Sequence, residues 1–252
     1  MRGRLAALFP FQTPEGKRLA VLFAIVYFAQ GMWYLPVQVV TISLKDRGLS
    51  AGQVADFFAI TIIPWLIKPV YGLISDFVPL FGYRRKSYLY LSSGTAALAG
   101  LALALFGDQS YWRMAYYLTA MAAGLAFTDV LVDALMVENG KPLGLTGAFQ
   151  SVQWAAIMTA SILVGELGGY LAEGRLLRAS FLVAACFPLV SLLMAIFVVR
   201  EAPAPAVGKE FRETWASIRA ALGARDVWVV AGFIFFFTFS PSFGPALLFY
   251  QT

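Results

Sequence analysis

Six ionisable side chains lie inside long apolar stretches of the sequence, where a charge is costly. They are Asp56, Lys68, Asp76, Asp129, Asp133 and Glu166. An ionisable group within a membrane helix costs roughly 2.5–3.5 kcal/mol on insertion scales, and such groups usually serve binding, coupling or gating. The chemistry that they indicate is the binding of a polar solute, or the uptake and release of a proton, within a membrane.

Several polar or aromatic side chains fall at a similar depth in these stretches. At about 1.5 Å per helical residue, they lie roughly 10–16 Å from one end. They are Gln30, Lys68, Asp129, Gln153 and Trp154. Asp133 follows Asp129 by four residues and so shares a helix face with it. We therefore expect one layer of a wet central cavity, in which these residues bind a solute or couple its movement to an ion.

Some of these residues also have ordinary structural explanations. Lys68 either pairs with Asp129 or Asp133, or extends its aliphatic stem so that the amine reaches the inner membrane surface. Asp133 belongs either to the cavity or to the membrane interface. Glu166, in the glycine-rich segment 164–169, is either a proton-coupling group or an outer-gate residue. The sequence leaves these alternatives open.

The composition restricts the class of protein. Of 252 residues, 60% are hydrophobic and only 13% are charged, whereas soluble domains have about 25% charged residues. There is no histidine and one cysteine, Cys186, which excludes His-based zinc and catalytic sites and an internal disulfide. No Walker motif is present. We expect no enzyme, cofactor or metal site, and no nucleic-acid partner, because the positive charges lie between apolar stretches.

The apolar stretches predict seven membrane helices, since about 20 residues cross a bilayer. They cover 19–44, 52–77, 87–107, 111–136, 146–172, 179–199 and 227–250. We expect an all-α, polytopic membrane helix bundle in the lipid bilayer. Its parts are a tail at 1–18, a six-helix bundle at 19–199, a linker at 200–226 and a seventh helix at 227–252.

Local signals refine these boundaries. Ser50 and Gln53 have the spacing of a capping box, which predicts that the second helix begins there. Gly140, Pro142 and Gly144 predict a break between the fourth and fifth helices.

Lys and Arg are concentrated in the loops on the side of the N-terminus, which predicts a cytoplasmic N-terminus and a cytoplasmic linker. The linker is amphipathic around Phe211, Trp215 and Ile218, so we expect it to lie along the membrane surface. The chain stops at Thr252, two residues beyond the seventh stretch, and we expect it to be a fragment.

The second apolar stretch carries a distinctive pattern, Ile-Pro-Trp-Leu-Ile-Lys-Pro-Val-Tyr-Gly-Leu-Ile-Ser-Asp at 63–76, followed by Gly-Tyr-Arg-Arg-Lys at 82–86. It resembles the folate-biopterin transporter family of the major facilitator superfamily. The segments Gln30-Gly31, 129–135 and Gln150-Ser151 are also similar to that family. The resemblance covers nearly the whole chain.

The resemblance implies a fold of the major facilitator type, with twelve helices in two six-helix halves and a substrate held between them. This chain would be the N-terminal half plus one helix, and the missing C-terminal half would be needed for function. The implied activity is secondary active transport of folates or pterins, coupled to protons, by alternating access. A bacterial inner membrane is expected rather than an organelle envelope.

The loop after the second helix also resembles the general facilitator signature, which implies a gating loop with Gly72, Asp76, Gly82, Arg84 and Arg85. The helix dipole disfavours an anion at a helix C-terminus, so Asp76 needs donors, and either arginine is in reach. Glycine at position 82 permits the tight turn that returns them. The alternative is a static topological anchor.

Two other functions stay open from the sequence alone. One is a facilitator for a different organic solute, such as an organic anion or S-adenosylmethionine. The other is a non-transporting membrane assembly factor, which the charges in the apolar stretches disfavour because a scaffold has little reason to bear their cost.

Overall fold

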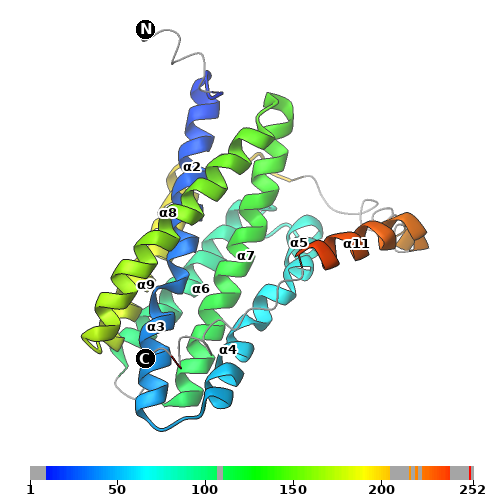
Figure 1. Cartoon of the computed structure of the whole chain (residues 1–252). Helices are drawn as coiled ribbons and strands as arrows, with labels where there is room; N and C mark the ends of the chain where they lie inside the picture. The colour runs from blue at the N-terminus through cyan, green and yellow to red at the C-terminus, as the bar shows by residue number, and fades with distance from the viewer. Residues whose placement is uncertain are drawn as a thin grey trace, which may run out of the picture.

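The computed structural model describes residues 10–106, 110–204, 216, 219–220, 223–238 and 250. Within these residues the chain is mostly helical, with one isolated antiparallel bridge between Leu80 and Tyr83. The helices are α2 (Pro14–Gly31), η1 (Met32–Tyr34), α3 (Leu35–Asp46), α4 (Ala51–Leu66), α5 (Lys68–Phe77), α6 (Lys86–Leu105), α7 (Tyr111–Leu143), α8 (Thr146–Glu173), α9 (Leu177–Phe197) and α11 (Arg225–Thr238) (Figure 1).

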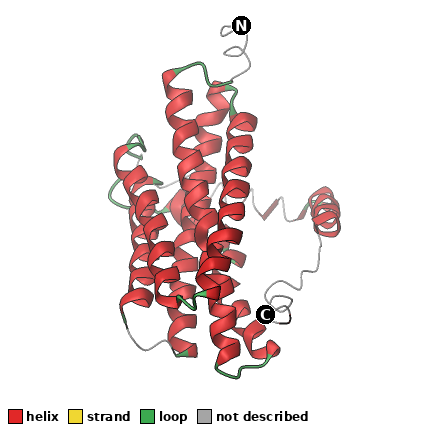
Figure 2. Ribbon diagram, turned by 60° about the vertical axis from the view of Figure 1, so that its left-hand side comes forward, coloured by secondary structure: helices red, strands yellow, loops and turns green. Residues whose placement is uncertain are grey.

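The expected all-α membrane bundle is confirmed. Six helical segments in the described residues are long and apolar enough to cross a membrane: Pro14–Asp46, Ala51–Phe77, Lys86–Leu105, Tyr111–Leu143, Thr146–Glu173 and Leu177–Phe197. They lie side by side as a bundle of upright helices (Figure 2). Helix α11 covers the first part of the expected seventh helix. Residues 239–249 and the stretch around Phe211, Trp215 and Ile218 lie outside the described residues.

Small residues let the helices approach closely. A Cβ atom added to Gly124 in α7 would lie 2.4 Å from the backbone oxygen of Ser92 in α6, and one added to Gly31 would lie 2.6 Å from Ala160 in α8. Since apolar burial gives little drive between helices in lipid, such close backbone packing is a main source of their association. The pairs α6–α7 and α2–α8 are therefore fixed by glycine positions.

The first two membrane segments are each broken, although the sequence predicted one continuous helix for each. The first is interrupted by the 3₁₀ turn Met32–Tyr34. The second is interrupted at Ile67, where φ is −99° and ψ is 16°. Pro69 has no N–H for the carbonyl of Trp65, and the N–H of Val70 bonds to the carbonyl of Ile67 at 2.9 Å. Lys68 thus becomes the first residue of α5.

The expected break between the fourth and fifth helices is present, but it lies at Gly144 and not at Gly140 or Pro142. Helix α7 continues through both residues and ends at Gly144, which has a φ of +65°. Gly140 stays helical and packs against the next helix, since an added Cβ would lie 2.8 Å from the hydroxyl of Thr146. Gly144 alone takes the left-handed conformation that ends helices.

The start of the second membrane segment is as the sequence predicts. The Ser50 amide donates to Gln53 Oε1 at 2.9 Å, and the Gln53 amide donates to Ser50 Oγ at 3.4 Å. This reciprocal capping box begins α4 at Ala51.

Candidate functional site

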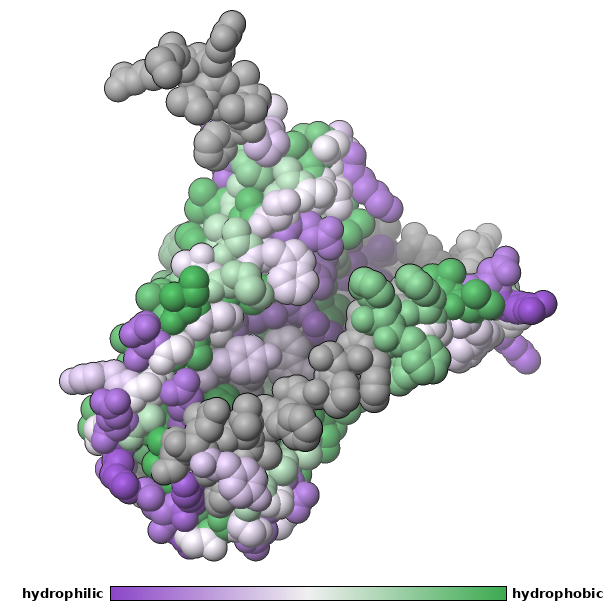
Figure 3. Space-filling model, viewed as in Figure 1, coloured by the Kyte–Doolittle hydropathy of each residue, from purple (hydrophilic) through white to green (hydrophobic). Residues whose placement is uncertain are grey.

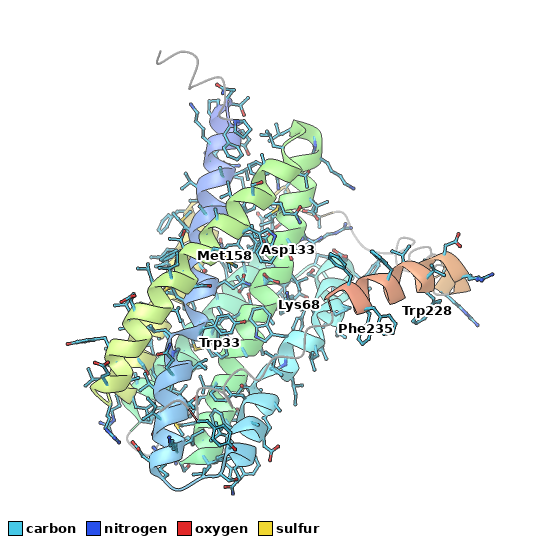
Figure 4. All side chains as sticks on the ribbon, viewed as in Figure 1. Trp33, Lys68, Asp133, Met158, Trp228 and Phe235 are labelled. Carbon is cyan, nitrogen blue, oxygen red and sulfur yellow. The ribbon has the colours of Figure 1, made fainter. Side chains whose placement is uncertain are left out.

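An ion pair between Lys68 and Asp129 lies at the break between α4 and α5. The Asp129 side chain is almost fully buried, and the Lys68 side chain is about one-third exposed, at 35%. The amine also lies 5.0 Å above the ring of Trp65. Of the two partners left open for Lys68, the structure places Asp129 against it. Hydrophilic residues line a recess between α8 and α5 (Figure 3), and Lys68 lies there near Asp133 (Figure 4).

Asp133 lies one helical turn further along α7 and is held by two donors. The hydroxyl of Tyr27 donates to Asp133 Oδ1, and Gln153 Nε2 donates to the same oxygen at 3.2 Å. Tyr27 is fully buried in α2, whereas Asp133 is exposed. These bonds join α2, α7 and α8 at one point.

The other three residues that were expected in the cavity, Gln30, Trp154 and Glu166, make none of the contacts described above. Gln30 Oε1 is buried and has no hydrogen-bond partner among the described residues. Trp154 is 58% exposed on α8. Glu166 is exposed on the same helix, and at about 1.5 Å per residue it is roughly 20 Å from Gln153. The structure therefore separates Glu166 from the polar layer.

A second charged cluster lies where α5, α6 and α7 meet. Arg85 is 6% exposed and donates to Asp76 Oδ1 at 2.5 Å, to Glu138 Oε1 at 2.6 Å and to Ser75 Oγ at 2.6 Å. Burial lowers the pKa of Arg85, but the hydrogen bonds and charges of Glu138 and Asp76 outweigh it and raise the pKa above its ordinary value. The guanidinium therefore stays charged. Of the two arginines expected to serve Asp76, Arg85 does so.

Glu201, which follows α9, closes this cluster from the other side. Its carboxylate accepts hydrogen bonds from the backbone amides of Arg84, Arg85 and Lys86 at 2.7–3.1 Å. These are the free amides at the start of α6, so a carboxylate from a distant segment caps this helix.

The turn before α6 has the shape that glycine was expected to permit. Phe81 and Gly82 have φ values of +52° and +80°, and the amide and carbonyl groups of Leu80 and Tyr83 bond to each other. The carbonyl of Gly82 also accepts from the amide of Ala204 at 2.8 Å. Gly72 faces α7, where an added Cβ would lie 3.6 Å from Val130. We call the residues Ser75, Asp76, Arg85, Glu138 and Glu201 the inner clasp.

The sequence did not single out Tyr27, Ser75, Glu138 or Glu201. Tyr27 looks like a packing aromatic in an apolar run, and the two glutamates lie at the ends of apolar runs, where solvated charges are common. In the described part of the chain, no group of three Cys, Asp or Glu residues is placed to hold a metal ion.

Comparison with known proteins places the chain among membrane transporters. It matches the BT1 family over residues 28–243. It is 33% identical over 247 residues to the folate-biopterin transporter of Synechocystis sp. (strain ATCC 27184 / PCC 6803 / Kazusa), a match that covers 95% of this chain and 49% of that protein.

Two further relatives come from eukaryotes. Probable folate-biopterin transporter 4 of Arabidopsis thaliana is 32% identical over 73% of this chain and 38% of its own length. Folate transporter 1 of Plasmodium falciparum (isolate 3D7) is 27% identical over 75% of this chain and 38% of its own length. The chain spans about half the length, or less, of these relatives. No solved structure matches it.

The family match covers most of the chain, and the six apolar helices are those of an integral, multi-pass membrane protein. The resemblance seen in the second membrane segment is thereby confirmed, and the chain belongs to the BT1 family of folate-biopterin transporters.

Proposed function

We propose that this chain forms one six-helix half of a secondary active transporter that moves folates or pterins across a membrane by alternating access, coupled to protons. The names of the relatives support this substrate class. Their length, about twice that of this chain, supports a second half that completes the cavity. The activity is transport and not an enzymatic conversion of the solute.

The observation that carries the proposal is the Lys68–Asp129 pair. A buried ion pair is often no more stable than apolar residues of the same volume, because both charges lose their hydration. A charge pair at a helix break beside a hydrophilic recess is therefore better explained if Lys68 exchanges its partner during transport. In the transport cycle, an anionic group of the solute takes the place of Asp129 beside Lys68 when Asp129 receives a proton.

The neighbouring polar residues complete the proposed cavity. Gln30, Asp133, Gln153 and Trp154 contact the solute. For Glu166, which lies far from this layer along α8, we keep the two roles of coupling group and outer gate as alternatives.

The inner clasp is the proposed gate. It links α5, α6, α7 and the segment after α9 through charged groups that can separate when the helices move. The turn at Gly82 and the close contact of Gly72 with α7 position Asp76 and the Arg84–Arg85 pair. We propose a cytoplasmic N-terminus. Because two membrane segments lie between the N-terminus and the inner clasp, the clasp is then also on the cytoplasmic side. The membrane is a bacterial inner membrane.

Uptake of labelled folate and labelled pterin tests the proposal. We would express the chain alone, and joined to the second half of the Synechocystis relative, in cells that lack folate uptake. The fusion should accumulate label in an inward proton gradient, and a protonophore should abolish this. Lys68→Met and Asp129→Asn should each lose uptake per molecule of protein in the membrane. Glu173→Gln, which changes an exposed carboxylate at the far end of α8, should keep it.

Three results would contradict the proposal. Normal uptake by both variants would reject the roles of Lys68 and Asp129. Uptake of an unrelated organic anion, without folate or pterin, would indicate a facilitator for another solute. A stoichiometric protein partner, together with no response to any solute, would indicate an assembly factor.

A further inference from the structure

We propose that Asp133 recognises the uncharged N–H edge of the pterin ring, so that the ring docks against α7 and α8 and the anionic end of the solute points away from Asp133. This inference rests on the proposed function, since it assigns one residue to one part of that substrate. It starts from the way the carboxylate of Asp133 is held.

Both hydrogen bonds to Asp133 converge on one oxygen. Tyr27 and Gln153 donate to Oδ1, which has two acceptor positions and is thereby saturated. No described residue donates to Oδ2, and the side chain is exposed. The two donors come from α2 and α8, so they fix the orientation of the carboxylate between three helices. The unused oxygen of this exposed side chain is therefore held in a fixed direction.

The local charges determine what this oxygen attracts. Lys68 contributes one positive charge, and Asp129 and Asp133 contribute two negative charges, which leaves a net charge of −1. Lys68 forms its ion pair with Asp129. Asp133 thus has no ion-pair partner among the described residues. It repels carboxylates and attracts N–H donors.

A folate has two chemically different ends. The pterin ring carries an N3–H and a 2-amino group side by side, both donors and both uncharged, whereas the glutamate end carries carboxylates. A carboxylate oxygen is the natural acceptor for the donor edge, as it is for the amino groups of nucleic-acid bases. Asp133 therefore selects the ring, and the glutamate end lies elsewhere in the cavity.

A matched pair of ligands isolates this contact. Lumazine has the pterin ring system with an oxygen in place of the 2-amino group. It therefore keeps the N3–H donor, but it presents an acceptor to Asp133 where pterin presents its second donor. The purified full chain in nanodiscs would be titrated with pterin, with lumazine and with 4-aminobenzoylglutamate, which carries the anionic end alone. Saturation-transfer NMR detects binding at millimolar affinity and so gives the dissociation constants.

Wild-type protein should bind pterin about 10- to 100-fold more tightly than lumazine, the range expected for a hydrogen bond to a charged group that is lost. Asp133→Asn should bring this ratio near one, since its amide both donates and accepts, and should not weaken binding of 4-aminobenzoylglutamate. Tyr27→Phe should reduce the ratio partly, because it frees the carboxylate to turn. Glu173→Gln serves as the control.

Two outcomes would overturn the inference, and they are distinguishable. A wild-type preference for pterin that persists in Asp133→Asn would overturn the role of Asp133 and leave the proposed function intact. Failure of the wild-type chain, and of its fusion with the Synechocystis half, to bind any pterin or folate would overturn both.

Discussion

Arg85 should be the most costly residue of the inner clasp to replace. Arg85→Met keeps the apolar stem and removes the guanidinium, so that Asp76, Glu138 and Ser75 lose their shared donor. The Asp76 and Glu138 side chains are about half exposed, at 46% and 50%, and so can regain water.

Each of the two ion pairs therefore counts as a surface pair, worth up to about 1 kcal/mol. The bond to buried Ser75 adds about 1 kcal/mol. The free energy of unfolding should fall by about 2–3 kcal/mol in Arg85→Met. Asp76→Asn and Glu138→Gln should each cost about 1 kcal/mol or less, because the other carboxylate still pairs with Arg85.

Unfolding by SDS in mixed micelles, followed by far-UV circular dichroism, measures these differences. Arg200→Met, at an exposed position beyond α9, is the control and should change stability by about 0.5 kcal/mol or less. Because the pKa of Arg85 is raised in the folded protein, its contribution to stability is fully present below the pKa of the unfolded chain and is lost only above the raised pKa of the folded protein. The difference between wild type and Arg85→Met should therefore be constant from pH 7 to pH 10. Equal stability of Arg85→Met and Arg200→Met would refute this reasoning, as would an Asp76→Asn variant as unstable as Arg85→Met.

Three further changes have defined outcomes. Gly124→Ala should lower the free energy of unfolding by about 2 kcal/mol or more in the same assay, because its Cβ meets the backbone of α6. Gly94→Ala, which has open space around the added Cβ, should be neutral or up to about 1 kcal/mol more stable. Equal effects of the two changes would contradict the packing of α6 on α7. Glu201→Ala should cost about 1–2 kcal/mol and speed hydrogen exchange at the amides of residues 84–86, and unchanged exchange would show that Glu201 is not their acceptor. Lys68→Met should lower the free energy of unfolding by about 3 kcal/mol, because it leaves Asp129 buried and unpaired. Combining Lys68→Met with Asp129→Leu should restore most of that stability without restoring uptake. A double variant less stable than Lys68→Met would mean that the pair is structural.

The sequence predicts those parts of the site that depend on local geometry or on the cost of a buried charge. The capping box at Ser50 follows from a four-residue pattern. Depth in the membrane limits the acidic partners of Lys68 to Asp129 and Asp133, and the structure selects Asp129. The short loop with its turn at Gly82 brings an arginine to Asp76, and the structure shows that it is Arg85.

Contacts that depend on how distant helices cross are not predictable in this way. Glu201 reaches the start of α6 across more than a hundred residues, and Tyr27 reaches Asp133 across a similar separation. Proline also gives an ambiguous signal. Pro64 and Pro142 both lie inside helices, while Pro69 follows a break.

The two breaks in the membrane segments differ in what covers them. At the first, Met32 and Trp33 are 1% and 8% exposed and only Tyr34, at 52%, is exposed, so protein covers most of the turn. At the second, Leu66 and Ile67 are 72% and 43% exposed, and the carbonyls of Trp65 and Leu66 lose their usual donors. An unsatisfied backbone group in hydrocarbon costs several kcal/mol, so irregular backbone within a membrane occurs where it is buried in protein or lines a wet cavity.

The second break is therefore better explained if it faces water or a second protein body than if it faces acyl chains. Lys68, the first residue of α5, lies at this break, and its ion pair with buried Asp129 stands on the same face as the exposed Asp133. The break and the charges thus point to one wet interior, bounded by α4, α5, α7 and α8, which is the interior that the proposed carrier function needs.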